Sequence, residues 1–149
     1  MMKDNKTAIT VVKVGGAVVE DATALSRLLT DFAAIPGRKI LVHGGGRRAT
    51  KVAEALGIKT TMVGGRRITD AAMLEVVTMV YGGLVNKNIV AGLQAIGVNA
   101  IGLTGADANI IRAHKRPVKD GVDYGFVGDV DAADGQMIAR LVESGVTPV

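Results

Sequence analysis

The sequence of 149 residues contains no cysteine, no tryptophan and only four aromatic side chains, two tyrosines and two phenylalanines. The absence of cysteine excludes a disulfide framework and a thiolate metal site. The scarcity of aromatics argues against a surface that stacks single-stranded nucleic acid. The net charge of +4 is small and the 18 basic residues are spread along the chain, so charge does not predict a nucleic-acid partner either.

Long apolar runs and an export signal are also missing. No uninterrupted apolar run reaches the length of about 18–20 residues that a membrane span needs. The first six residues, MMKDNK, lack the apolar core of a signal peptide. These features predict a cytoplasmic protein that does not enter a membrane.

Aliphatic residues and glycine are plentiful: 48% of the residues are hydrophobic and 20 are glycine. A core built from Val, Ile, Leu, Ala and Met is typical of a sheet covered on both faces. Strand-like runs at 9–14 and 39–42 are each followed by a helical pattern, at 22–35 and 49–56. The alternation predicts a single α/β domain that begins β-α-β-α.

The remainder of the chain adds two hairpins to this pattern. Gly64-Gly65 predicts a tight turn within a hairpin over 60–69, and Gly82-Gly83 divides a long apolar pattern over 71–95 into two helices or one kinked helix. The other predicted elements are a strand at 99–103, a polar and peripheral hairpin (110–118 and 124–130), a helix at 133–144 and a strand that starts at 146. Because the chain stops at that strand, we expect an unpaired sheet edge and a fragment or isolated domain.

Two glycine-rich turns, each directly after a strand-like run, are the most informative feature. They read VKVGG at 12–16 and VHGGG at 42–46. Such turns expose several backbone N–H groups, and a following helix adds the positive end of its dipole. Lys13 would supply a full positive charge, so the pair indicates a site for phosphate. Turn glycines without a ligand are the simpler interpretation of either turn taken singly.

Other glycine-rich sites fit less well. Residues 44–49, GGGRRA, match G-x-G-x-x-A, but no acidic residue follows at the distance that a dinucleotide fold requires. The HGGG segment is similar to an oxyanion-hole segment of α/β-hydrolases, but the G-x-S-x-G elbow is absent. A Walker A loop is absent too. The only other histidine, His114, falls in the polar hairpin, so we interpret His43 as structural rather than as a metal ligand.

Charged residues near these turns suggest how an acidic substrate could be held. Lys13 lies among valines that predict a strand covered on both faces, where a lysine would need a partner. Strand alternation sends the side chains of Arg66 and Arg67 to opposite faces, so that one can point into a cleft. Arginine binds carboxylates with two parallel hydrogen bonds.

Taken in order, the motifs resemble the N-terminal half of the amino acid kinase family and, within it, the acetylglutamate kinases. They are VKVGG at 12–16, VHGGG at 42–46, GRRIT at 65–69, VNK at 85–87, GLTGAD at 102–107 and GFVGDV at 125–130. The resemblance implies a three-layer α/β/α sandwich with a mainly parallel sheet and two peripheral hairpins. It also implies that residues 1–149 are the half that binds the amino-acid substrate and forms a homodimer, without the nucleotide-binding half.

The implied activity is transfer of a phosphoryl group from ATP, with Mg²⁺, to the side-chain carboxylate of N-acetyl-L-glutamate or a related N-acylglutamate. The product would be an acyl phosphate in arginine biosynthesis. The resemblance assigns catalysis to Lys13, phosphate binding to Lys13, Gly15, Gly16 and Gly44, and acylglutamate binding to Gly45, Gly46 and Arg67. It implies no metal site built from side chains.

Two alternatives stay open at this point. Residues that the family places in its C-terminal half are missing from this chain, so it could be a non-catalytic module for acylglutamate binding or assembly. Another amino acid kinase, acting on carbamate or aspartate, is the second alternative, although the GRRIT hairpin at 65–69 favours acylglutamate. The acyl group itself, acetyl or longer, depends on packing in the pocket.

Overall fold

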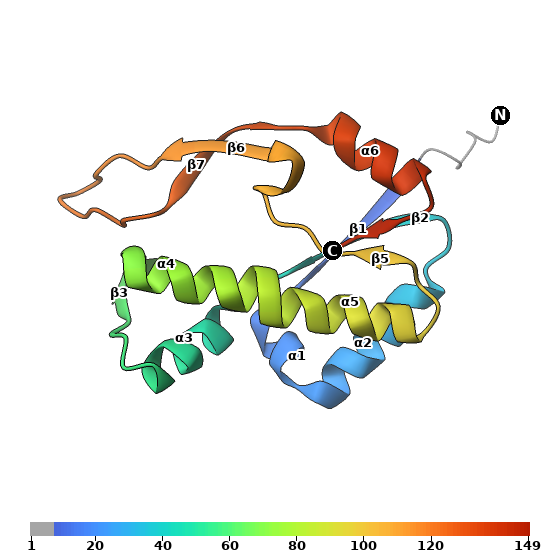
Figure 1. Cartoon of the computed structure of the whole chain (residues 1–149), viewed down its shortest axis with the longest axis horizontal. Coiled ribbons are helices and arrows are strands. Elements are labelled where there is room, and N and C mark those ends of the chain that lie inside the picture. Colours follow the sequence, from blue (N-terminus) through green and yellow to red (C-terminus); the bar gives the residue numbers. More distant parts are fainter. Residues whose placement is uncertain (1–7) are drawn as a thin grey trace.

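Two pairs of parallel strands form the middle layer of the protein in the computed structural model, which describes residues 8–149 (Figure 1). β1 (Ile9–Val14) pairs with β2 (Arg38–His43), and β5 (Ala100–Ile101) pairs with β8 (Thr147–Pro148). β8 also lies beside β2. The first six residues, on which the prediction about export depends, lie outside the described part of the chain.

Helices on both sides complete three layers (Figure 1). One side carries α1 (Gly16–Glu20), α2 (Ala22–Ala34), α3 (Gly46–Ala55) and a long helix over residues 71–95. The other side carries α6 (Gly135–Glu143) and an antiparallel hairpin, β6 (Ile111–Lys115) with β7 (Gly128–Ala133). A short 3₁₀ turn, η3 (Asp107–Asn109), leads into that hairpin. The predicted α/β/α sandwich with its parallel strand pairs is confirmed.

The long helix is continuous, although the sequence predicted a break or a kink. It consists of α4 (Ala71–Val77), η2 (Thr78–Val85) and α5 (Asn86–Ala95). The middle part, η2, is a π-helix that contains Gly82 and Gly83. A π-helix has wider turns than an α-helix and changes the phase of the side chains that follow it.

By length and composition, this 25-residue helix could cross a membrane, with a mean hydropathy of 1.3 over its most apolar window. An uninterrupted apolar run was not visible in the sequence because polar residues lie within it. The observation is weak, since the core helix of a soluble protein passes the same test. Met73, Val76, Val80, Ile89 and Leu93 are buried in the core, as in such a helix.

Two features of the last three strands, β6 to β8, differ from the expectation. β8 is paired, because the Thr147 N–H donates to Asn99 O and the Val149 N–H donates to Ile101 O, both at 2.8 Å. The predicted unpaired edge at the last strand was therefore wrong. The polar hairpin is peripheral, as predicted. Its strands are further apart in the sequence than predicted: the first ends at Lys115, the second begins at Gly128, and residues 116–127 between them form a loop.

Lys39 stabilises the end of α2 from a buried position. Its ammonium donates to Ala33 O at 2.7 Å and to Ile35 O at 2.8 Å, and it lies 5.3 Å from the centre of the Phe32 ring. Burial lowers the pKa of Lys39. The two carbonyls belong to the last turn of α2, whose carbonyls have no partner within the helix.

Replacing Lys39 with methionine should lower the free energy of unfolding by about 1–3 kcal/mol, because it leaves two carbonyls without a charged donor. Chemical denaturation measures this loss. The matched control is Lys59→Met, at an exposed lysine, which should change the free energy of unfolding by less than about 0.5 kcal/mol. Equal stability of the two variants would contradict the role of Lys39.

Candidate functional site

The two glycine turns lie against each other at the ends of β1 and β2. The Gly44 N–H donates to Val14 O at 3.2 Å, which extends the pairing of the two strands into the turns. A Cβ atom on Gly16 would lie 3.8 Å from Gly46 N and 3.9 Å from Gly45 N. The backbone nitrogens of both turns therefore share one small region. The helices α1 and α3 begin there, with Gly15 and Gly45 as their N-cap residues.

The glycines of the second turn lie close to Tyr81 and to the first turn, and none of Gly44, Gly45 and Gly46 has a positive φ. Tyr81, from η2, packs on them: a Cβ on Gly45 would lie 3.6 Å from its ring, and one on Gly46 would lie 3.3 Å from its hydroxyl. Sequence reasoning did not identify Tyr81, although it is one of only two tyrosines.

Lys13 lies at the end of β1, two residues before the first glycine turn. The expectation that this strand is covered on both faces was wrong: Lys13 is exposed and Val11 is 60% exposed. α6 packs against β2 and β8, and this face of β1 is open. Within residues 8–149, the Lys13 ammonium has no hydrogen bond or ion pair, so its charge is available to a ligand.

Arg67 belongs to β4 (Arg66–Ile68), and its side chain extends to the second glycine turn at the start of α3. Its guanidinium donates to Gly46 O at 2.9 Å and to the Thr50 hydroxyl at 2.7 Å. Arg66, on the opposite face of the strand, is exposed. The predicted alternation is confirmed. The turn between β3 (Thr61–Val63) and β4 has φ of 55° at Gly64 and 75° at Gly65, as a tight hairpin of this kind requires.

A polar network centred on the buried Asn86 lies directly behind the second turn. Asn86 is 1% exposed, and its side-chain nitrogen donates to His43 Nε2 at 3.1 Å and to Val149 O at 3.0 Å. The Lys87 ammonium donates to Asn86 Oδ1 and to Gly102 O, both at 3.1 Å. The other ring nitrogen of His43 lies 3.0 Å from Gly44 O. The interpretation of His43 as a hydrogen-bonded structural residue is confirmed.

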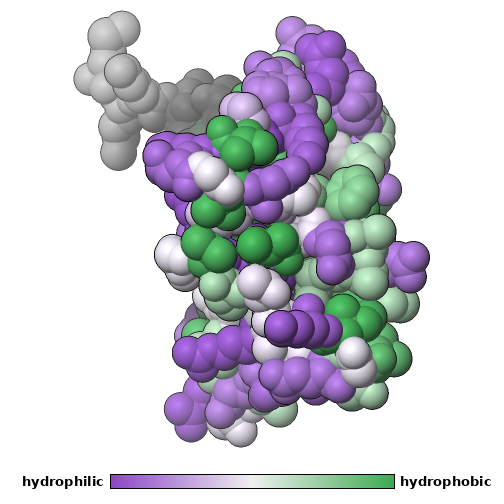
Figure 2. All heavy atoms as spheres, turned by 90° about the vertical axis from the view of Figure 1, so that its left-hand side faces the viewer, coloured by the Kyte–Doolittle hydropathy of each residue, from purple (hydrophilic) through white to green (hydrophobic). Residues whose placement is uncertain are grey.

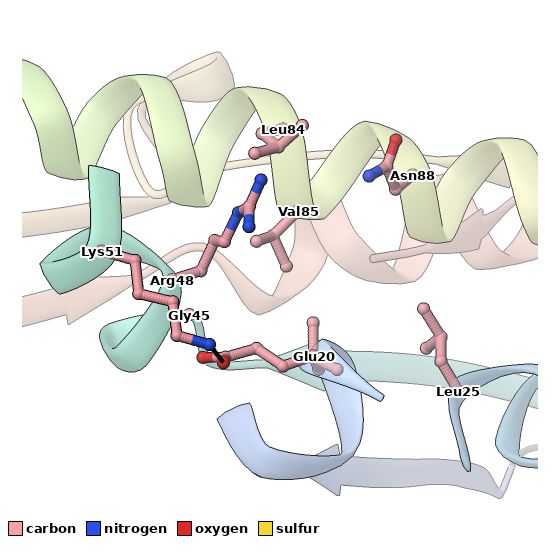
Figure 3. A pocket seen from close by; sticks show the side chains of 9 residues that line it. Glu20, Leu25, Gly45, Arg48, Lys51, Leu84, Val85 and Asn88 are labelled. Carbon is pink, nitrogen blue, oxygen red and sulfur yellow. Dashed lines mark hydrogen bonds and ion pairs between the residues drawn. The ribbon is translucent and has the colours of Figure 1, made fainter. Parts of the chain in front are cut away.

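A cavity of about 200 Å³ lies on the other side of the second turn (Figure 3). It is lined by Gly45, Arg48 and Lys51, by Glu20 of α1, and by Leu84 and Asn88 of the long helix, among others. Lys51 pairs with Glu20 at 2.9 Å. Of the predicted site residues, Gly45 lines this cavity, whereas Lys13 and Arg67 do not, so the cavity adjoins the region that the two turns share only through Gly45.

A larger cavity, of about 660 Å³, lies between the β3–β4 hairpin and the loop that joins β6 to β7. Arg66 and Arg116 line it together with Asp129. Arg116 donates twice to Asp129, at 2.7 and 2.8 Å, and holds the pKa of that carboxyl below its usual value. These elements face the viewer in Figure 2, where hydrophobic side chains gather amid hydrophilic ones. Exposed apolar residues of this hairpin and loop are Met62, Val118 and Phe126.

Gly125 holds that loop against the end of β4. The Thr69 N–H donates to Tyr124 O at 2.9 Å and the Phe126 N–H donates to Thr69 O at 2.7 Å. Gly125 has φ of 73°, and a Cβ there would overlap the Thr69 carbonyl. Both observations require glycine at this position.

Replacing Gly125 with alanine should release the loop, so that hydrogen exchange at the Phe126 amide becomes at least about tenfold faster. Gly121→Ala is the matched control, because Gly121 lies in the same loop at φ 74° and a Cβ there would meet nothing within 4 Å. That variant carries the same backbone strain and should leave the Phe126 amide protected. Equal exchange in both variants would show that strain, not the contact with Thr69, controls the loop.

Carboxylates and imidazoles do not gather into a metal centre in the described part of the chain: residues 8–149 hold no group of three or more His, Asp or Glu side chains placed for one ion. The backbone nitrogens of the two turns lie together, the Arg67 guanidinium contacts the second turn, and the exposed Lys13 lies two residues before the first. This combination suits an anionic ligand that carries both a phosphoryl group and a carboxylate.

Comparisons with known proteins agree with the motifs. The chain is 65% identical over 149 residues to the acetylglutamate kinase of Bacteroides fragilis, covering all of this chain and 57% of that one. It is 68% identical over 141 residues to that of Bacteroides thetaiotaomicron, covering 95% of this chain and 54% of that one. It thus spans little more than half the length of these relatives.

A solved structure agrees as well. The protein smu.665 from Streptococcus mutans superposes with a TM-score of 0.77 at 25% identity, covering 94% of this chain and 56% of that one. The sequence model of the amino acid kinase family matches residues 8–149. The resemblance inferred from the motifs is confirmed, and the chain belongs to the amino acid kinase family.

Proposed function

We propose that this chain is the substrate-binding part of a kinase that phosphorylates the side-chain carboxylate of N-acetyl-L-glutamate or a related N-acylglutamate. One observation carries the proposal: the two glycine turns lie together, the exposed Lys13 stands two residues before the first turn, and the Arg67 guanidinium donates to Gly46 of the second. High identity to proteins called acetylglutamate kinase supports it. We propose that this reaction is a step of arginine biosynthesis and that it takes place in the cytoplasm.

The chemistry asks for positioning and charge neutralisation rather than for a base. A side-chain carboxylate has an ordinary pKa of about 4.3 and is ionised at neutral pH. One of its oxygens attacks the γ-phosphorus of ATP, the bond to the bridging oxygen breaks, and ADP leaves with that electron pair. Charge on the transferring group grows and must be compensated by fixed donors. Mg²⁺ would enter with ATP as part of the substrate.

The residues divide between the two ends of the acylglutamate. Lys13 compensates the charge of the transferring group, and the N–H groups of Gly15 and Gly16 hold its oxygens. The Gly44 N–H is donated to Val14 O at 3.2 Å, so Gly44 shapes the phosphate-binding turn rather than donating to the phosphate. Gly45 and Gly46 contact the acylglutamate, and Arg67 binds its α-carboxylate. Nη2 of Arg67 donates to Gly46 O and Thr50, whereas Nη1 makes only longer contacts with the Thr60 hydroxyl at 3.4 Å and Met73 Sδ at 3.7 Å. A carboxylate would replace these longer contacts.

We also propose that residues 1–149 form the amino-acid-binding and dimerisation half of the enzyme, and that nucleotide binding needs residues beyond the matched part. The share of 54–57% of the relatives' length supports this division. The chain by itself would then bind acylglutamate without turning over ATP. The full-length protein is this chain together with any further residues that its gene encodes.

Calorimetry and a kinase assay together test these statements. N-acetyl-L-glutamate should bind both the chain and the full-length protein, and the full-length protein should consume ATP when acylglutamate is present. Binding of aspartate or carbamate in its place would indicate another amino acid kinase. Binding by the full-length protein without any turnover would leave only the non-catalytic module.

A further inference from the structure

A network of His43, the buried Asn86 and Lys87 lies behind the second glycine turn. Its hydrogen-bond donors and acceptors can be assigned without ambiguity. The Lys87 ammonium can only donate, so the atom that it contacts on Asn86 must be the oxygen. The Val149 carbonyl can only accept, so the atom facing it must be the Asn86 nitrogen.

The orientation of Asn86 determines the tautomer of His43. Since the Asn86 nitrogen is a donor, His43 Nε2 must accept and carries no proton. The proton of the neutral ring is then on Nδ1, from which it is donated to Gly44 O at 3.0 Å. Protonation at Nε2 would instead place a donor against a donor and break the network.

Gly102 provides a second, independent sign that this network is a built feature. A Cβ at Gly102 would overlap Asn86 Oδ1 and come within 2.6 Å of the Lys87 ammonium. The φ of Gly102 is not positive, so backbone freedom does not require glycine there. The absence of a side chain at this position leaves the space that Asn86 and Lys87 occupy.

We propose that His43 and Asn86 are positioning residues that orient the peptide between Gly44 and Gly45. The carbonyl and the N–H of a trans peptide point in opposite directions. Holding Gly44 O on His43 therefore aims the Gly45 N–H away from the ring. Gly45 N lies beside Gly16, in the region shared by the two turns. A preorganised N–H at that place would contact an anionic oxygen at no cost of reorganisation.

This role rests on the proposed function, but its geometric part can be tested without activity. Long-range proton–nitrogen correlation NMR on the full chain at neutral pH identifies the protonated ring nitrogen, and His43 and His114 are the only two histidines. His43 should carry its proton on Nδ1. A proton on Nε2 would overturn the proposal without any variant being needed.

Asn86→Asp removes both amide donations while preserving the acceptor for Lys87. It should move the His43 proton to Nε2 or charge the ring. In the full-length protein it should lower kcat about tenfold or more, with a smaller change in KM for acylglutamate. Gln94→Glu, the same change from amide to carboxylate at an exposed residue of the same helix, should alter neither the tautomer nor kcat.

An unchanged tautomer or an unchanged kcat in Asn86→Asp would contradict the proposal. Failure of the proposed function would look different: the unmutated full-length protein would show no acylglutamate turnover, while His43 would still carry its proton on Nδ1.

Discussion

Replacing Lys13 with alanine will lower kcat of the full-length protein at least about 100-fold and leave its stability nearly unchanged. The exposed Lys13 ammonium has no partner within residues 8–149, so its removal takes away no internal contact. What is lost is the full charge beside the glycine turns. Removing one donor from a preorganised anion site costs roughly 100- to 1,000-fold in rate.

Steady-state kinetics and thermal unfolding measure the two halves of this expectation. Lys59→Ala, at another exposed lysine, is the matched control and should keep both kcat and the unfolding temperature. If Lys13→Ala worked at nearly the normal rate, Lys13 would not be the catalytic cation.

The second large effect concerns Arg67. Arg67→Ala should raise KM for acylglutamate by roughly 10- to 100-fold, because a charged hydrogen bond contributes about 1.5–3 kcal/mol. A smaller fall in kcat should accompany it, since Arg67 also holds the Gly46 carbonyl.

Two neighbouring variants separate these effects. Arg66→Ala, on the exposed face of the same strand, should leave KM unchanged. Thr50→Val removes one of the contacts that orient Arg67 but keeps the arginine, so KM should rise less than in Arg67→Ala. An unchanged KM in Arg67→Ala would remove this residue from the substrate site.

The features that follow from local chemistry were predictable from the sequence. Two successive glycines between short β-forming runs require a tight hairpin, and the structure has positive φ at both Gly64 and Gly65. Asp70 is an aspartate directly before a helix, the residue type that N-caps favour, and its carboxylate accepts from the Met73 N–H at 2.8 Å. Both outcomes depend on residues within a few positions of each other.

Features that depend on distant packing were not predictable. The exposure of Lys13 depends on where α6 and the β6–β7 hairpin lie, which strand patterns do not specify. The pairing of β8 with β5 joins Ala100 to Thr147, which are 47 positions apart. The contact of Tyr81 with the glycine turn was not predictable from helical periodicity. The π-helix shifts the phase of the pattern, so a regular period does not show which residues face the turn.

The site itself falls between these cases. The two glycine turns were visible because each follows a strand, and neighbouring parallel strands end at the same edge of a sheet. The side-chain contacts of the site join separate elements, so they could be seen only in the structure. They are the contacts of Arg67 with Gly46 and Thr50 and the hydrogen bond of Asn86 to His43.

A trapping assay tests the central claim most directly. The full-length protein, incubated with ATP, Mg²⁺ and hydroxylamine, should convert N-acetyl-L-glutamate or another N-acylglutamate into the hydroxamate that only an acyl phosphate yields. Free glutamate, aspartate and carbamate should react far less. Hydroxamate from aspartate but not from any N-acylglutamate, or ATP consumption without hydroxamate from any of these acids, would contradict the account.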